Sequence, residues 1–413
     1  MHATKAEREL ALQRVLHASG AGKNQLARTV AVLCADHKAV LERALPRDRV
    51  IAGAFARLES PPARQVFGAL LLHLASEGCD GVLEHAPYVQ GVAMLATKAK
   101  YFVRDPHTWQ RPGRNMHRQF SSLLRHCLAH YDVPAFMDQA WCEADAQSAR
   151  DWFIDIGRGY NIRHSHGLPF VLTKRMAHQF IHAPNDLRIE EALRWAQVTG
   201  QGGDDRLARA IIATRLGRNG FAHEHYWGGV VRFFIAHPLE RNGKLSEVVD
   251  LLAHRLDAGE PVNIAGRTAA SITRLSDEWH RTVSRAAGTL VDRRWQPSGL
   301  LEGAYTTGKA QERLKWKVTE LLSLQALAAE GRALQHCVAT YVTACSRRVT
   351  AIFSITAEDV LGNVERLGTI EVQISTSRVV QAKAKRNTQL GAAARAVLEK
   401  WAQREHLTIN DKL

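Results

Sequence analysis

The chain has 413 residues, of which 46% are hydrophobic and 23% are charged, a composition that excludes a protein disordered throughout its length. Its 55 Lys and Arg residues outnumber its 41 Asp and Glu residues, and the resulting net charge of +14 favours polyanionic partners, nucleic acid first. Hydrophobic cores stop growing at roughly 250–300 residues, so two or more domains are expected.

No signal peptide is expected, because the first residues are polar and charged and no apolar segment follows them. No stretch approaches the roughly 20 apolar residues that a transmembrane helix needs, so no membrane insertion is expected. The six cysteines include no C-x-x-C pair, and most lie in apolar helical patterns, as reduced core cysteines do. These features predict a cytoplasmic protein.

Amphipathic helices are predicted for most of the chain up to about Arg294. Apolar residues recur there at helical spacing, and Pro61 and Pro62 precede one such stripe, where prolines suit a first helical turn. Segments rich in glycine and polar residues predict the loops between helices. The predicted helices include 66–74, 116–131, 207–216, 228–236 and 245–256, and the predicted loops are 157–169, 200–205, 217–225 and 257–267.

A domain boundary is predicted between residues 293 and 309, which carry a tryptophan, a proline and three glycines with little periodicity. Within this segment, 303–309 has the spacing of the first part of a phosphate-binding P-loop. Ala310 replaces the Ser or Thr that would hold Mg²⁺, so the segment is assigned to a linker. The expected organisation is a mainly helical region at 1–294, a linker at 295–310 and a smaller domain at 311–413.

The C-terminal domain is predicted to be an α+β module with an antiparallel sheet. Leucines at 321, 324 and 327 indicate a helix that ends at Gly331, and an apolar stripe from Leu334 to Cys345 indicates a second helix. β-branched residues and alternation predict three strands, and Trp401 belongs to a closing helix. The predicted strands are 351–356, 368–374 and 378–384.

The last two strands can be paired by matching their apolar residues. This register places Val372 opposite Val380, Glu371 opposite Gln381 and Thr369 opposite Lys383, because a slip of one residue would bury polar side chains. One face of the hairpin then carries Glu371, Gln381, Lys383 and Lys385. A solvated sheet face is the simpler interpretation of this pattern, and a functional site is the alternative.

An ordered set of short motifs runs from Glu330 to Asn387. The chain reads E-G-x-x-L-x-H-C-V-x-x-Y, then A-I-F-S-I, T-I-E-V and V-V-Q-A-K-A-K-R-N. This set resembles the PcfJ-like proteins, which are encoded in bacteria largely with conjugative plasmids and other mobile elements. The resemblance implies an accessory protein of such an element and does not by itself imply a reaction. A related hexapeptide, H-C-L-A-H-Y, occurs at 126–131, so the H-C-V-A-T-Y segment alone is not specific.

Two hypotheses for function follow. In the first, the protein binds DNA or RNA, the helical region acts as a scaffold or a protein-partner surface, and a basic segment contacts phosphates. This segment comprises Arg378, Lys383, Lys385, Arg386 and Asn387.

In the second hypothesis, the C-terminal domain is an enzyme that modifies nucleotides or nucleic acid. His336 would be its acid or base, Tyr341 a positioning hydroxyl and Glu371 a base or metal ligand. Gln381 and Lys385 would contact the phosphate or the transition state. A metal-independent nuclease is the simplest such enzyme and a transferase is the alternative, and no cofactor is expected for either.

Histidine pairs in the helical region have spacings that could supply imidazole ligands. They are His164 with His166, His178 with His182, and His223 with His225. No H-E-x-x-H motif and no cysteine pair completes a zinc set, so structural or surface roles are predicted and no metal site is expected.

Overall fold

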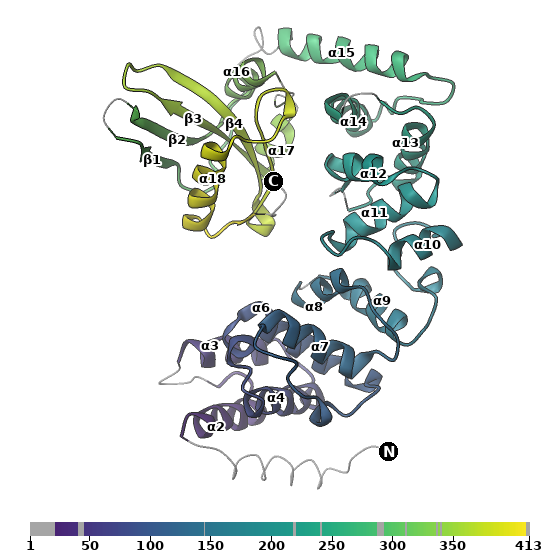
Figure 1. Cartoon of the computed structure of the whole chain (residues 1–413), viewed down its shortest axis with the longest axis vertical. Helices are drawn as coiled ribbons and strands as arrows, with labels where there is room; N and C mark the ends of the chain where they lie inside the picture. Colours follow the sequence, from purple (N-terminus) through teal and green to yellow (C-terminus); the bar gives the residue numbers. More distant parts are fainter. Residues whose placement is uncertain are drawn as a thin grey trace. The chain divides into compact units, whose positions relative to one another are not determined.

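The computed structural model describes residues 21–39, 45–143, 145–217, 220–239, 242–286, 293–309, 312–335, 338 and 341–409. Its contacts divide the chain into two compact units. Unit 1 comprises Met1–Ile212 with Gly217–Tyr226, and unit 2 comprises Ala213–Leu216 with Trp227–Leu413. The predicted α+β class is confirmed, since many helices precede a C-terminal sheet (Figure 1).

Several helices of unit 1 bury one apolar stripe, whereas α11 (Ile189–Gly200) is buried around most of its circumference. In α7, for example, Phe120, Leu123 and Leu124 are buried, as the amphipathic pattern predicts. The helices of unit 1 are α2 Ala21–Ala35, α3 Pro46–Ala56, α4 Pro61–Ser76, α5 Asp80–Glu84, α6 Ala86–Thr97, α7 Met116–Leu128, α8 Gln139–Cys142, α9 Gln147–Gly157, α10 Lys174–Ile181, α11 Ile189–Gly200 and α12 Asp205–Ile212. Further helices, α13 Glu224–Ala236, α14 Asn242–Asp257 and α15 Ala269–Ala286, precede the sheet.

Two predicted helices are too long. The helix predicted for 116–131 ends at Leu128, because Ala129 takes an extended conformation and leaves Tyr131 outside the buried stripe. The helix predicted for 207–216 ends at Ile212, and a short 3₁₀ turn, Arg215–Gly217, follows it. The other three predicted helices lie within α4, α13 and α14.

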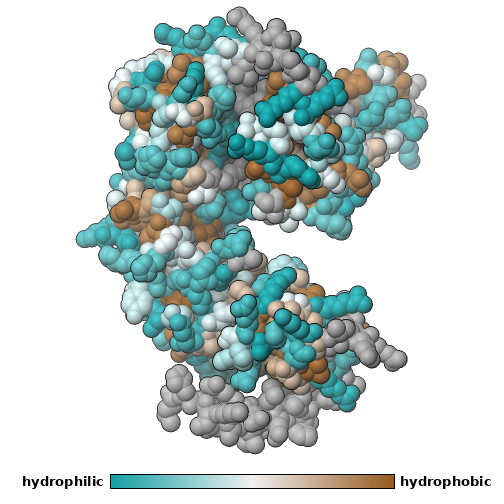
Figure 2. Space-filling view, turned by 180° about the vertical axis from the view of Figure 1, so that it is seen from behind, coloured by the Kyte–Doolittle hydropathy of each residue, from teal (hydrophilic) through white to brown (hydrophobic). Residues whose placement is uncertain are grey.

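The described helices do not combine the length and the apolar composition that crossing a bilayer requires. On the face drawn in Figure 2, hydrophilic residues predominate and hydrophobic residues lie in scattered groups.

The C-terminal part of unit 2 is a six-stranded sheet in which each strand pairs with the next one along the chain. Neighbouring strands are antiparallel, except that β5 and β6 are parallel. The strands are β1 Gly303–Thr307, β2 Leu314–Glu320, β3 Thr350–Glu358, β4 Val364–Gln373, β5 Arg378–Lys383 and β6 Thr408–Ile409, and the helices are α16 Leu324–Leu334, α17 Val342–Ser346 and α18 Ala392–Arg404.

Helices cover both faces of this sheet. On one face, α18 packs against apolar side chains, with the rings of Trp401 and Phe353 4.7 Å apart between centroids. On the other face, Ile352 packs with Leu327 of α16 and Cys345 of α17 in a smaller apolar cluster. The period of two along each strand separates the two faces, so one face carries the main core and the other has room for polar groups.

The segment 295–310 was predicted to be a linker, but it contains β1, the first strand of the sheet. The indole of Trp316 on β2 donates to Oγ1 of Thr307 at 2.8 Å, so the two strands are also joined through their side chains. This finding also removes the P-loop resemblance, because most of the glycine-rich segment is extended and Gly308 begins the turn to β2. The alternating L-K-W-K-V-T-E of β2 is a strand signal that the predicted elements omit.

The first helix of this domain does not end at Gly331. It continues to Leu334, where Gln335 takes a left-handed conformation with φ of 54° and ψ of 46°. The stripe from Leu334 to Cys345 is therefore not one continuous helix, because α16 ends before the left-handed Gln335 and α17 is a separate helix that begins at Val342.

The register of the last hairpin is partly as predicted. Thr369 pairs with Lys383 and Glu371 pairs with Gln381, but Val372 pairs with Val379 instead of Val380. A β-bulge between these pairs inserts one extra residue into β5, so Val379 reaches the buried face.

Glu330 fixes α16 to the sheet. Its carboxylate accepts hydrogen bonds from Ser354 on β3 at 2.8 Å and from Thr369 on β4 at 2.9 Å, and Nε of Arg366 lies 3.0 Å from it. The Glu330 side chain is only 1% exposed. Burial raises its pKa, while the two hydroxyls and Arg366 act in the opposite direction.

We predict that a fragment beginning at Arg293 folds cooperatively, whereas one beginning at Gly308 does not. The shorter fragment lacks β1 and also Leu301, whose carbonyl accepts from Trp401 at 2.8 Å and whose N–H donates to Glu405 at 2.9 Å. Thermal melts followed by circular dichroism would compare the two fragments. Equal melting temperatures would show that 293–307 is a linker after all.

We predict that Glu330→Ala lowers the free energy of unfolding by about 2 kcal/mol, because two buried hydroxyls lose their acceptor. Chemical denaturation of the full chain would measure the change. Glu365→Ala is the matched control, since Glu365 is an exposed carboxylate on β4, and it should change stability by less than about 0.5 kcal/mol. An equal effect of the two substitutions would contradict the proposed anchoring role.

Candidate functional site

Polar side chains occupy the sheet face that α16 and α17 cover. They come from alternate positions of three adjacent strands, as the period of two requires. Thr350, Ser354 and Thr369 are buried, whereas Gln381 and Lys383 are half-buried. The face is therefore not the freely solvated surface that the simpler interpretation expects. We call this set, together with Glu371, the polar face.

Glu371 lies on the polar face and accepts a hydrogen bond from the hydroxyl of Tyr341, which donates to its Oε2 at 3.0 Å. Oγ1 of Thr350 lies 3.3 Å from its Oε1, while the Thr350 hydroxyl donates to the carbonyl of Val372 at 2.9 Å. Tyr341 precedes α17 and is buried in the small apolar cluster beside Ile352. The fold thus pairs a phenol with a carboxylate, and Gln381 lies directly opposite on β5.

A cation from the helical part of unit 2 adjoins this pair. The guanidinium of Arg215 lies 5.0 Å from the centroid of the Tyr341 ring, and its Nε lies 3.1 Å from Oδ1 of Asp250. Burial lowers the pKa of Arg215, but Asp250, Tyr341 and Glu371 together raise it above its ordinary value. Arg215 therefore stays charged beside the phenol and the carboxylate.

A basic turn follows β5 and meets the end of α16. It is the 3₁₀ turn Lys385–Asn387, in which Arg386 has φ of 59° and donates from Nε to Oε1 of Gln335 at 2.7 Å. Lys385 and Arg386 are exposed. Lys385, predicted to lie on the strand with Lys383, therefore belongs to the turn beyond β5.

The predicted site residues are only partly brought together. Tyr341, Glu371 and Gln381 share the polar face, and Lys383 lies two positions further along β5. Arg378 is at the opposite end of β5, where it pairs with Thr408 of β6, so it is separated from the basic turn. The backbone of Asn387 closes that turn. His336 lies outside the described residues, and its predicted exposure on a helix is not tested.

Four residues near the polar face were missed by the sequence-based predictions. Thr350 and Ser354 alternate with Ile352 on β3, so parity along that strand could have identified them. Gln335 occupies an unspecified position of the motif, and its bond to Arg386 joins residues 51 positions apart. No sequence pattern pointed to Arg215, because it comes from a helical segment far from the residues of the polar face in the sequence.

The part of the chain that the structure describes contains no group of three or more His, Cys, Asp or Glu side chains that could hold a metal ion. The rings of His178 and His182 stack with centroids 4.3 Å apart, and Nδ1 of His182 lies 2.8 Å from the carbonyl of His178. The rings of His223 and His225 are 6.3 Å apart.

Comparison with known proteins gives one family. Residues 302–398 match a family model described as PcfJ-like protein. No curated protein and no solved structure matches the chain. The match extends from the start of β1 into α18 and contains the whole polar face and the basic turn. It confirms the resemblance that the motifs indicated: the C-terminal domain is a PcfJ-like domain.

Proposed function

We propose that the protein binds nucleic acid through its PcfJ-like domain and serves as an accessory protein of a bacterial mobile element. The observation that carries the binding proposal is the exposed basic turn, Lys385 and Arg386, at the end of α16. Cations at an exposed turn can approach phosphate oxygens, and the net charge of +14 adds long-range attraction. The role in a mobile element rests on the family resemblance.

In this proposal a hydrogen bond orients the Arg386 side chain, whereas the Lys385 side chain is exposed to solvent. The bond from Nε of Arg386 to Gln335 leaves the other guanidinium nitrogens available for a phosphate and holds the group in one orientation. The side chain of Lys385 is exposed at this turn. Its ammonium group can therefore release a counterion when it meets a phosphate.

We predict that the full chain binds labelled DNA or RNA with a dissociation constant in the micromolar range or below at about 50 mM salt, and that log K falls linearly with log salt. Lys385→Ala should weaken binding to all sequences and lower the salt slope by about one ion. Fluorescence anisotropy over a series of salt concentrations would measure both quantities.

Lys400→Ala is the matched control, because Lys400 is exposed on α18, which covers the opposite face of the sheet. It removes the same charge and should leave the slope within error of the wild type. A wild-type chain that binds no nucleic acid at about 50 mM salt would contradict the proposed function. Equal slopes for all three proteins would instead show that binding occurs away from the basic turn.

A nuclease or another nucleotide-modifying enzyme is the second candidate, and the Tyr341–Glu371 pair favours it. A carboxylate in a partly desolvated site can accept the proton of an attacking hydroxyl or water. Arg215, Gln381 and Lys385 would stabilise the charge that develops on the phosphate. His336 would protonate the leaving oxygen.

We predict that Glu371→Gln lowers any turnover by about 10² to 10⁴-fold with folding intact, because an amide cannot act as the base. Labelled single-stranded DNA, double-stranded DNA and RNA would be incubated with and without divalent metal, and shift and cleavage scored in the same gel. His336→Ala tests the proposed acid in the same way. If the wild-type chain cleaves or modifies none of these substrates, the enzyme hypothesis is wrong and the binding proposal stands alone.

A further inference from the structure

Unit 1 exposes tyrosine rings beside cations on one surface. Tyr131 is 64% exposed and Tyr160 is 59% exposed, which is unusual for side chains of this size. Arg158 is exposed next to Tyr160, and Tyr101 is half-buried. We call Tyr101, Tyr131, Arg158 and Tyr160, with Lys100, the tyrosine surface.

Two rings of this surface, those of Tyr101 and Tyr160, lie beside Arg158. Its guanidinium carbon lies 5.8 Å from the ring centroid of Tyr101 and 5.5 Å from that of Tyr160. Tyr131 packs against Gly159, which has φ of 83°, and a Cβ at that position would lie 2.7 Å from the Tyr131 ring. Two constraints therefore favour glycine at position 159: the positive φ of the backbone and the close approach of the Tyr131 ring.

Backbone hydrogen bonds hold the segments of the tyrosine surface together. The N–H groups of His130 and Tyr131 donate to the carbonyl of Gly157 at 2.7 and 3.0 Å, and Val103 donates to Cys127 at 2.7 Å. These bonds join the ends of α7 and α9 to the chain that follows Tyr101. The rings are thus presented in a fixed arrangement, which reduces the entropy that a ligand would have to overcome.

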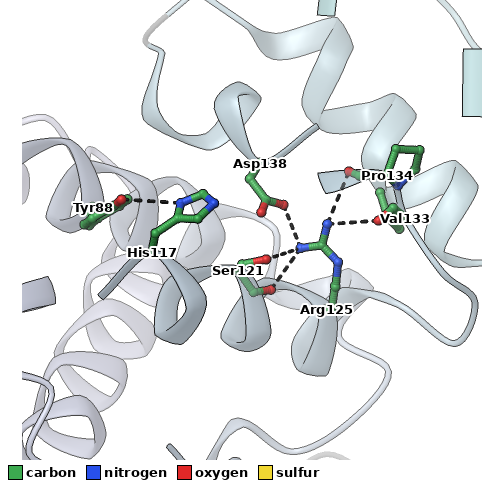
Figure 3. Close-up of polar contacts among 7 residues, drawn as sticks. All are labelled: Tyr88, His117, Ser121, Arg125, Val133, Pro134 and Asp138. Atoms are coloured by element: carbon green, nitrogen blue, oxygen red, sulfur yellow. Dashed lines mark hydrogen bonds and ion pairs between the residues drawn. The ribbon is translucent and has the colours of Figure 1, made fainter. Parts of the chain in front are cut away.

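Arg125 fixes the loop that follows Tyr131 (Figure 3). Its guanidinium donates to the carbonyls of Val133 at 2.9 Å and Pro134 at 3.2 Å, and to Oδ1 of Asp138 at 2.7 Å. It also donates to the hydroxyl of Ser121 within α7 at 2.7 Å. A guanidinium with several partners of this kind has a structural role, and it joins α7 to the segment that follows Tyr131.

The tyrosine surface also carries two exposed cations, Lys100 and Arg158. Nζ of Lys100 lies 4.8 Å from the Tyr101 ring centroid. Neither Lys100 nor Arg158 has a carboxylate within ion-pair distance in the described ranges, whereas neighbouring Lys98 is paired with Asp151 at 2.5 Å. Two unpaired cations beside exposed rings provide contacts for phosphates and for the flat faces of bases.

We propose that the tyrosine surface binds single-stranded nucleic acid, with bases stacked on Tyr131 and Tyr160 and phosphates held by Arg158 and Lys100. Unpaired bases are required because duplex bases are already stacked on one another and present only their edges. Cations beside exposed rings favour a ligand that carries both phosphates and flat aromatic groups. The ligand class rests on the proposed function, but the site lies in unit 1, outside the PcfJ-like domain.

The test uses full-length protein and a fluorescent oligo-dT, with a DNA duplex and an abasic oligonucleotide of the same length. Tyr131→Ala and Tyr160→Ala should each weaken binding to oligo-dT by about fivefold or more. They should change binding to the duplex and to the abasic strand by less than about twofold, because neither offers a base for stacking. Tyr160→Phe keeps the ring and should bind oligo-dT as the wild type does.

Arg114→Ala is the matched control for Arg158→Ala, because Arg114 is an exposed arginine just before the other end of α7. Only Arg158→Ala should weaken binding to oligo-dT, and thermal melts would verify that each variant is folded.

Folded Tyr131→Ala and Tyr160→Ala variants that bind oligo-dT like the wild type would overturn the inference. If Lys385→Ala still weakens binding in that case, the proposed function survives without this site. Loss of oligo-dT binding in the tyrosine variants with no effect of Lys385→Ala would support this site and contradict the basic turn.

Discussion

The polar face of the C-terminal sheet depends on one buried carboxylate. Glu330 reaches from α16 to hydroxyls on β3 and β4, and Arg366 neutralises it from the edge of the covered region. Without these partners a charge in this position would be strongly unfavourable, and α16 could not lie over polar strands. Glu371 follows Thr369 by two positions on β4, so it shares this face, and it accepts a hydrogen bond from Tyr341. One ionic anchor thus supports the geometry of a second carboxylate.

Alternation within strands predicted much of this arrangement. The pairing of Glu371 with Gln381 follows from matching apolar to apolar residues, since only one register keeps both faces consistent. The bulge that brings Val379 to the buried face could not be predicted in this way. Val379 and Val380 are both apolar, so the sequence does not show which of the two valines faces the core. The helix end at Gln335 was missed for a related reason. A glutamine in a left-handed conformation carries no local sequence signal, whereas the nearby Gly331 is the residue usually expected there.

The contacts that depend on tertiary structure could not be predicted at all. Arg215 reaches Tyr341 from a segment more than a hundred residues earlier, and nothing in its own neighbourhood distinguishes it from other arginines. The tyrosine surface likewise depends on three separate segments that meet only after unit 1 folds. The most exposed ring of this surface, that of Tyr131, was predicted to belong to the apolar stripe of a helix. The apolar stripe of α7 extends to it in sequence, but the helix ends three residues earlier and turns the ring outward.

The ends of the PcfJ-like domain are joined to each other. The carbonyl of Leu301 accepts from the indole of Trp401 and from the guanidinium of Arg404, while its N–H donates to Glu405. Entry into the sheet and exit from its last helix therefore lie at the same place, although about a hundred residues separate them in the chain. A domain whose ends meet can be added to, or inserted into, an unrelated scaffold without disturbing its strand order. Because its two ends are joined, the domain is attached to the rest of the chain at one place, and the form of its sheet does not require its ends to be held apart.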